Sequence, residues 1–261
     1  SNNVKEGRSV RCIKGESLIS SSSSEAESSS SFYKPSWEFL NPDLEALYDT
    51  IIDDRDGQVY KTIAIGKQVW MAENLNYRYQ AGTAELDSSS FCYMNDPDSC
   101  AKYGRAYLWS AAMDSSGVFP TTTETGCGYY DTCSIVVPFQ GICPDGWRLP
   151  SKNDWERLFN YMGEDEYFGL SMKSKTGWTM LEDNYNKYNG TDDYGFSANP
   201  TAYRSKSGTY GIDADANFWS SNQDDYIVWL RGGENRVTVS DNGGSKGVAM
   251  SVRCVKDLVE E

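Results

Sequence analysis

Histidine is absent from the 261-residue sequence. Imidazole is the base of Ser-His-Asp and Cys-His nucleophile pairs, and it is the commonest ligand for zinc, copper and haem in proteins. Its absence excludes most familiar hydrolase chemistry for this chain and removes the usual donor of transition-metal sites.

Basic residues are scarce relative to acidic ones. The chain has 24 lysines and arginines against 38 aspartates and glutamates, which gives a net charge of −14. Such a chain repels phosphate backbones and anionic lipid, whereas nucleic-acid binders usually carry a basic surface. We therefore expect neither a nucleic acid nor a membrane surface as partner.

Long apolar segments are also lacking. No run of about 18 apolar residues occurs, and no basic stretch followed by an apolar core stands at the N-terminus. The sequence therefore predicts no membrane insertion and no signal peptide within these residues. If the protein is exported, its signal was removed or lies outside them.

The cysteines favour disulfides over a metal site. A Cys-only zinc site requires two CxxC-like pairs, and none occurs. Six cysteines lie in the second part of the chain, an even number in a Gly-, Tyr- and Trp-rich sequence. We expect three disulfides and an oxidising location, either secreted or at the cell surface in association with the outer membrane. The seven cysteines are Cys12, Cys92, Cys100, Cys127, Cys133, Cys143 and Cys254.

A serine-rich segment divides the chain. Ser17–Ser31 reads SLISSSSSEAESSSS and offers almost nothing to bury, so it cannot repay the entropy of ordering. We interpret residues 17–39 as a flexible linker. The alternative, a glycosylated stalk, usually adds Thr and Pro, which this tract lacks.

A short repeat stands on both sides of the domain. Ser9–Glu16 reads SVRCIKGE and Ser251–Leu258 reads SVRCVKDL, with five identical residues around a cysteine. The repeat suggests tandem domains, with residues 1–16 the remnant of the terminal strand of a preceding copy. Cys12 would then be unpaired or intermolecular; the alternative is a free cysteine in a tail. Ser9–Lys14 could also complete the sheet of a neighbouring molecule.

Two segments have helical signals. Asn41-Pro42 precedes Leu44, Leu47 and Tyr48, which share one helical face, so the folded domain is predicted to begin here. The clearest helix is Ser151–Met162, where a capping serine precedes apolar residues at spacings of 3, 4 and 7. It is predicted to pack one face on a core.

Strand signals occupy the rest. β-forming residues from Val59 to Val69 are interrupted by Asp56-Gly57 and Gly66-Lys67, which predicts hairpin strands. The acidic run Asp53–Gly57 is better explained as a turn than as a metal site. The predicted class is α+β with long irregular loops. Later strands are expected at Phe218–Ser221, Tyr226–Leu230, Arg236–Ser240 and Met250–Val255.

Six sequence blocks follow one another along the chain. They are DRDGQVY (Asp54–Tyr60), IGKQVWMAENL (Ile65–Leu75), YGRAYLW (Tyr103–Trp109), CPDGWRLP (Cys143–Pro150), FWSS (Phe218–Ser221) and SVRCVK (Ser251–Lys256). In this order they resemble the FISUMP family, a paralogous domain found in many copies in Fibrobacter and related bacteria. The resemblance covers roughly Asn41–Asp257, so residues 40–257 are taken as the domain and 258–261 as a tail.

The last three blocks also resemble the wider C-type-lectin-like superfold, which includes formylglycine-generating enzymes. The resemblance implies twisted antiparallel sheets with one or two helices, stabilised by disulfides. It implies that Cys143 pairs with Cys254. The local pairs Cys92–Cys100 and Cys127–Cys133 would then remain.

Calcium is the one cofactor that the sequence suggests. Asp213, Asp215 and Asn217 alternate oxygen ligands ahead of FWSS, and Asp224 follows. The EF-hand pattern would place Gly and Glu where Phe218 and Asp224 stand, and the Glu-Pro-Asn signature of calcium lectins is absent. Solvated turn acids are the alternative.

Aromatic side chains in loops are candidate ligand contacts. Flat rings stack on sugar faces or anchor a protein partner. The tryptophans inside the six blocks are instead expected in the core: Trp70, Trp109, Trp147, Trp155 and Trp219. The candidate ligand-binding residues are Tyr129, Tyr130, Trp178, Tyr185 and Tyr188.

Catalysis is not expected. Formylglycine-generating enzymes use cysteines near the C-terminus, whereas Cys254 is better used in a structural bridge that leaves no thiolate. Any pairing of glycosidase carboxylates among 38 acidic residues is arbitrary. The sequence favours a non-catalytic recognition module for polysaccharide or a surface protein. The alternative is a structural domain that assembles with other copies of itself.

Overall fold

The computed structural model describes residues 44–79, 89–116, 135–136, 138–163, 168–178, 189–205, 210–212, 215–222, 226–240 and 246–258. The predicted linker 17–39, the first copy of the repeat at Ser9–Glu16 and Cys12 lie outside these residues.

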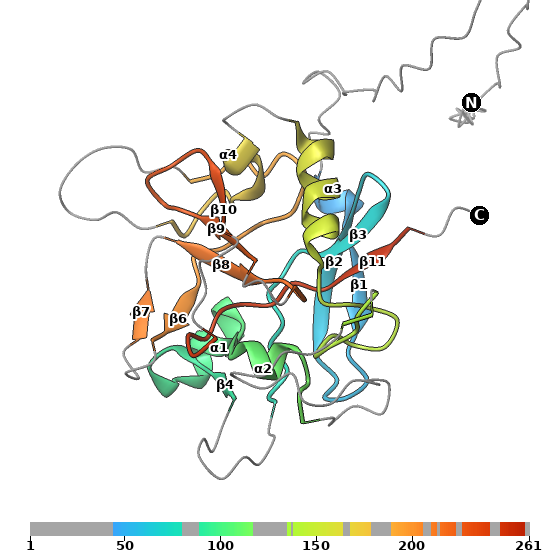
Figure 1. Ribbon diagram of the computed structural model, residues 1–261. Coiled ribbons are helices and arrows are strands. Elements are labelled where there is room, and N and C mark those ends of the chain that lie inside the picture. The colour runs from blue at the N-terminus through green and yellow to red at the C-terminus, as the bar shows by residue number, and fades with distance from the viewer. Residues whose placement is uncertain are drawn as a thin grey trace, which may run out of the picture. The chain divides into compact units, whose positions relative to one another are not determined.

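The first sheet is antiparallel in the order β1-β2-β3-β11 (Figure 1). The predicted hairpin is confirmed, because Ile65 pairs with Gln68 across the turn, and Gly66 adopts a φ of +61°. The closing strand begins at Val255, so it lies further along the chain than the predicted Met250–Val255. The strands are β1 (Asp49–Ile52), β2 (Val59–Ile65), β3 (Gln68–Met71) and β11 (Val255–Asp257).

The acidic run between β1 and β2 is a turn, as predicted. Asp53 is fully buried, and its carboxylate accepts hydrogen bonds from Arg55 Nε at 2.8 Å and Nη2 at 2.6 Å. Its backbone carbonyl accepts from the Gly57 amide at 2.7 Å. Arg55 Nη1 then donates to the Ile142 carbonyl at 2.7 Å. The turn therefore ties the first sheet to the loop that leads to the main helix.

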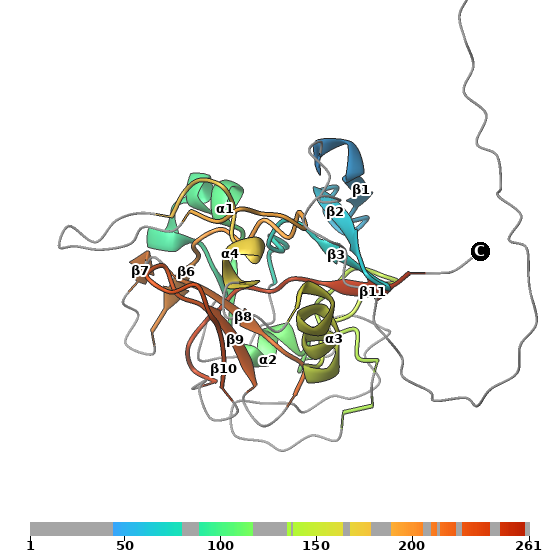
Figure 2. The same ribbon diagram turned by 90° about the horizontal axis from the view of Figure 1, so that it is seen from above.

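The main helix is α3 (Lys152–Met162), and its predicted cap is confirmed. Ser151 Oγ accepts from the Asp154 amide at 3.2 Å, and Asp154 Oδ2 accepts from the Ser151 amide at 2.9 Å. Trp155 is fully buried, with ring centroids 4.7 Å from Trp70 and 5.8 Å from Phe218. The helix therefore packs where the two sheets meet (Figure 2).

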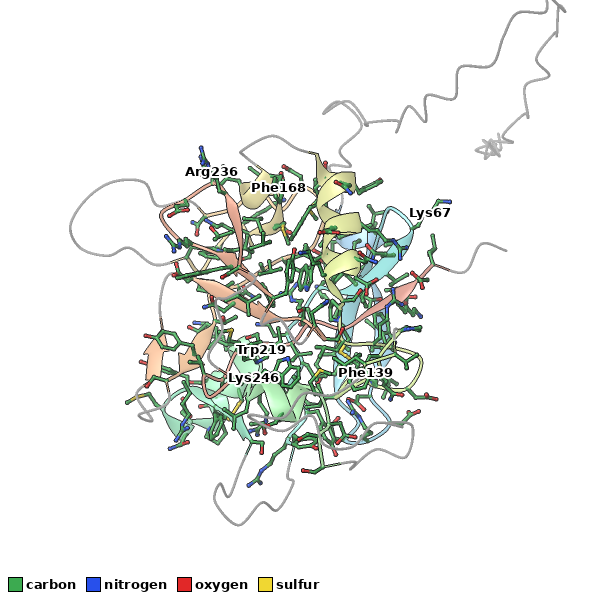
Figure 3. All side chains as sticks on the ribbon, in the orientation of Figure 1. Lys67, Phe139, Phe168, Trp219, Arg236 and Lys246 are labelled. Atoms are coloured by element: carbon green, nitrogen blue, oxygen red, sulfur yellow. A yellow bond between two sulfur atoms is a disulfide. The ribbon has the colours of Figure 1, made fainter. Side chains whose placement is uncertain are left out.

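The second sheet is antiparallel in the order β10-β9-β8. Phe218 and Val228 pair across it and face the cluster around Trp155. The next pair, Trp219 and Ile227, faces a second core cluster. Figure 3 shows Trp219 among the inner side chains. The sheet is therefore covered on both faces along part of its length. Its strands are β8 (Ala216–Trp219), β9 (Ile227–Leu230) and β10 (Val237–Ser240).

The structure has more helices than the one or two that were expected. The described residues contain four α-helices, of which α3 is the longest. No helix in these ranges is long and apolar enough to cross a membrane. The remaining elements are η2 (Leu44–Leu47), β4 (Ser90–Phe91), η3 (Tyr93–Asn95), α1 (Pro97–Tyr103), β5 (Ala106–Tyr107), α2 (Trp109–Ala112), α4 (Phe168–Met172), β6 (Ala202–Arg204) and β7 (Tyr210–Ile212).

The tryptophans of the six sequence blocks lie in the core, as predicted. Four of the five are fully buried, and the fifth is 6% exposed. They divide between the two clusters that flank the second sheet. The five are Trp70, Trp109, Trp147, Trp155 and Trp219.

Two disulfides hold the described residues. Cys143, ahead of α3, bonds to Cys254, ahead of β11, so the pairing implied by the resemblance is confirmed. Cys92 and Cys100 form a local bridge between η3 and α1. The predicted bridge between Cys127 and Cys133 lies outside the described ranges. The fold is thus an α+β domain of antiparallel sheets stabilised by disulfides.

The segment that leads into β11 is deeply buried. Val252, Arg253 and Cys254 are fully buried. Arg253 Nε donates to Asn74 Oδ1 at 2.8 Å, and Nη2 donates to the Ser197 carbonyl at 2.9 Å. This segment therefore joins the first sheet to the loops beside the second.

Candidate binding site on the second sheet

Trp229 is the partly exposed aromatic residue of strand β9. Its neighbours Val228 and Leu230 are fully buried, whereas Trp229 is partly exposed. The register places Asn217 of β8 and Thr238 of β10 directly beside it. Directly opposed residues on neighbouring strands point to the same face. The three side chains therefore form one row across the sheet.

The indole of Trp229 is held at its edge and over its face. Asp215 Oδ2 accepts from Trp229 Nε1 at 2.9 Å, and Asp215 Oδ1 accepts from the Gly232 amide at 2.9 Å. The Arg231 guanidinium lies 4.0 Å from the Trp229 ring centroid. Arg231 Nη1 also donates to Glu234 Oε1 at 3.1 Å. We call Asp215, Trp229, Arg231 and Glu234 the Trp229 platform.

A buried lysine, Lys173, holds the backbone of the platform. Lys173 Nζ donates to the carbonyls of Arg231 and Glu234 at 2.6 Å each. Burial lowers the pKa of Lys173 to about 8, although Asp215 and Glu234 favour its charged form. Lys173 thereby fixes the turn that places Arg231 over the ring.

Trp178, a predicted ligand contact, lies behind this support. It is 5% exposed, and its Nε1 donates to Ser174 Oγ at 3.1 Å and to the Ala198 carbonyl at 3.2 Å. Its ring lies 4.6 Å from Lys173 Nζ. The structure therefore places Trp178 where it positions Lys173, and its direct binding role stays a prediction.

One of the four predicted calcium ligands, Asp215, belongs to the platform, and a second, Asn217, lies opposite Trp229 in the sheet. Both Asp215 carboxylate oxygens accept hydrogen bonds from the protein, as described above. The Asn217 side chain is 9% exposed and makes no hydrogen bond to the described residues. Asp213 and Asp224 lie outside them. Within the same ranges no group of three or more Cys, Asp or Glu side chains could hold a metal, and calcium binding stays a prediction.

The four predicted tyrosine contacts cannot be placed, because Tyr129, Tyr130, Tyr185 and Tyr188 lie outside the described residues. Sequence reasoning also missed Trp229 and Arg231. The run around Trp229 is continuously apolar, so no alternation marks one side chain as exposed. The only sequence signal was the Gly232-Gly233 turn after Arg231, which lets the chain reverse so that the Arg231 side chain can lie over the Trp229 ring.

The family model described as Fibrobacter succinogenes major domain matches residues 63–256. The chain belongs to this family. No curated protein and no solved structure matches the chain. The match runs from β2 to β11, so the whole Trp229 platform lies inside the Fibrobacter succinogenes major domain. The same is true of both disulfides described above.

Proposed function

We propose that this chain is a non-catalytic recognition module of a secreted or cell-surface multidomain bacterial protein. Its scaffold is C-type-lectin-like, and its ligand is a polysaccharide that contacts the Trp229 platform. The observation that carries the proposal is the partly exposed indole of Trp229, fixed by Asp215 and Arg231 on the face of a sheet. Rigid aromatic side chains are favoured contacts because little conformational entropy is lost on binding.

The chemistry around Cys254 supports a role without catalysis. A thiolate is needed for cysteine reactivity, and Cys254 is bonded to Cys143. The same two bridges support an oxidising location. The tyrosines predicted in the loops, Tyr129 and Tyr130, would extend the contact surface of the module.

An assembly role is the second candidate, and the closing segment favours it. Of the five residues shared by the two copies of the repeat, the first four are buried in the second copy, Ser251–Cys254. Identity at buried positions is expected if both copies close domains of one kind. The parent protein would then be an array of such domains, and Ser9–Lys14 would complete a neighbouring sheet.

Affinity electrophoresis against cellulose, xylan and pectin tests the recognition proposal. We expect Trp229→Ala to weaken binding at least about tenfold, as for central aromatic contacts. Tyr161→Ala removes an aromatic side chain that is 40% exposed on α3 and should bind normally. Equal binding by both variants, or no binding to any of the three polysaccharides, would contradict a glycan role for the platform.

Two further measurements separate the alternatives. Loss of binding with a chelator would support calcium beside Asp215. Sedimentation of the chain under oxidising and reducing conditions tests assembly, because a dimer linked through Cys12 would disappear on reduction. A monomer in both conditions, with Cys12 reacting as a free thiol, would count against the proposal that Ser9–Lys14 completes the sheet of a neighbouring molecule.

A further inference from the structure

Asn217 is the polar residue of strand β8, and the fold leaves its side chain unused. Asn217 is 9% exposed, and its side-chain amide forms no hydrogen bond with the described residues. Withdrawing an amide from water without supplying a partner destabilises a folded protein. The fold therefore gains nothing from this polar group, and departures of this kind are expected where a residue serves a ligand.

The backbone of Asn217 is fixed by bonds that point away from β9. Its backbone amide donates to Thr201 Oγ1 at 3.2 Å, and its carbonyl accepts from the Ser251 amide at 3.1 Å. Asn217 and Trp229 are therefore a non-hydrogen-bonded pair of the antiparallel sheet. Opposed side chains come closest in such pairs, with Cβ atoms about 4.5–5.5 Å apart. The Asn217 side chain thus lies directly beside the Trp229 indole.

The Asn217 amide is within reach of a ligand. Within the described part of the chain, Trp155 Nε1 and Asn235 Oδ1 are sealed from solvent without a hydrogen-bond partner. The two amide atoms of Asn217 are also without a partner, but they are not sealed in this way. Each of them therefore keeps contact with the surface beside Trp229.

The carboxylate on the same strand is already occupied. Both Asp215 oxygens accept hydrogen bonds from the protein, one from Trp229 Nε1 and one from the Gly232 amide. The Asn217 amide, in contrast, offers a carbonyl acceptor and an NH₂ donor together. Two neighbouring hydroxyls of a sugar match this pair, because one can donate to the carbonyl while the other accepts from the NH₂.

We propose that Asn217 is the specificity-determining residue of the Trp229 platform and selects polysaccharide chains with unsubstituted hydroxyls over O-acetylated ones. Acetylation replaces the hydroxyl hydrogen, which removes the donor for the Asn217 carbonyl, and it adds bulk against a side chain that is 9% exposed. A site built to hydrogen-bond a hydroxyl discriminates against a ligand that lacks it. This inference rests on the proposed function, because it concerns the ligand of the same platform.

Affinity electrophoresis with cellulose, xylan and pectin, each in free and O-acetylated form, tests the assignment. We expect the unaltered protein to bind the free form at least about tenfold more tightly than the acetylated form. Asn217→Leu keeps the approximate shape but cannot form hydrogen bonds. It should weaken binding to the free form at least about fivefold and remove the preference. Equal binding of the two forms by the unaltered protein, or an unchanged preference in Asn217→Leu, would overturn the assignment.

Urea denaturation distinguishes a binding role of Asn217 from a structural one. Because no hydrogen bond is lost, the midpoint of Asn217→Leu should equal or exceed that of the unaltered protein. Asn74→Leu is the matched control, since Asn74 is 7% exposed and both of its amide atoms are bonded. Its midpoint should fall. A fall as large in Asn217→Leu would show a structural role and overturn the assignment.

Trp229→Ala separates this inference from the proposed function. If the unaltered protein binds none of the three polysaccharides, or if Trp229→Ala binds as tightly as it does, the platform and the role of Asn217 are both refuted. If Trp229→Ala loses binding and Asn217→Leu does not, the assignment of Asn217 alone fails. A chelator should leave the preference for the free form unchanged. Its disappearance would show that Asn217 acts through a metal ion and would also overturn the assignment.

Discussion

Arg253 carries a guanidinium group that is buried without an ion-pair partner among the described residues. Burial lowers its pKa to about 10, although Asp192 favours the charged form. Burying such a charge is costly unless its donors are satisfied. Here backbone carbonyls and the Asn74 amide accept from it, and the Phe196 ring lies 4.6 Å from the guanidinium carbon. The planar fork of arginine is what lets one side chain bond so many acceptors at once.

Arg253→Lys should therefore be destabilising although it keeps the charge. An ammonium cannot reach the same acceptors, so we expect a loss of about 2 kcal/mol in the free energy of unfolding. Urea denaturation measures it. Arg157→Lys is the control, because the Arg157 side chain is 46% exposed and pairs with Asp257 at the surface. A control loss as large as that of Arg253→Lys would contradict the argument.

At the scale of elements, the N-terminus of α3 is stabilised by one carboxylate. Burial alone would raise the pKa of Asp154, but the bonds from Arg148 and Ser151 outweigh it, so the pKa is lowered from 3.8. Arg148 Nη2 lies 2.6 Å from Asp154 Oδ1. The charged carboxylate therefore holds both the helix cap and the strand-like segment before it.

This lowered pKa predicts a dependence of stability on pH. Asp154 binds its proton less tightly in the folded state than in the unfolded state. The stabilisation that its carboxylate provides is therefore fully present above pH 3.8, the ordinary pKa of this group. It is lost as pH falls through the lower pKa of the folded protein. Asp154→Asn should lose about 2 kcal/mol at neutral pH and show a flatter fall in urea midpoint at acid pH. Parallel curves for the two proteins would contradict this assignment.

The elements that were predicted correctly from the sequence are those whose signals lie in residues close together along the chain. The cap and apolar spacing of α3, and the Gly66 turn of the β2–β3 hairpin, are local patterns. The start of β11 was misplaced because the backbone of residues 250–254 bonds in turn to different elements, including Tyr107, Trp219 and Met71. The Trp229 platform was missed because the exposure of Trp229 depends on which residues, distant in sequence, cover each face of the second sheet. Asp215 was found for its oxygens, whereas its contact with Trp229 required the fold.

At the scale of the whole molecule, two disulfides close loops of very different length. Cys143 and Cys254 are 111 residues apart, whereas Cys92 and Cys100 are 8 apart. The entropy lost by the unfolded chain grows with the logarithm of that separation. The long bridge is therefore expected to contribute more to stability than the short one.

Paired cysteine-to-alanine variants measure this difference. Removing Cys143 and Cys254 together should lower the free energy of unfolding by about 4–5 kcal/mol, and removing Cys92 and Cys100 by about 2–3 kcal/mol. Thermal and urea unfolding of the two double variants give the comparison. Equal losses would show that strain or residual structure in the unfolded chain decides the outcome.

The burial of Val252–Cys254 also bears on how this domain is made. Strand β11 and the residues before it are synthesised after every other element of the domain, yet both core clusters include them. A ribosome-bound chain that lacks them has an open core and one unpaired sulfur ahead of α3. The core of the domain is therefore completed only after its final strand is released, which leaves earlier translation products with exposed apolar surface that chaperones bind.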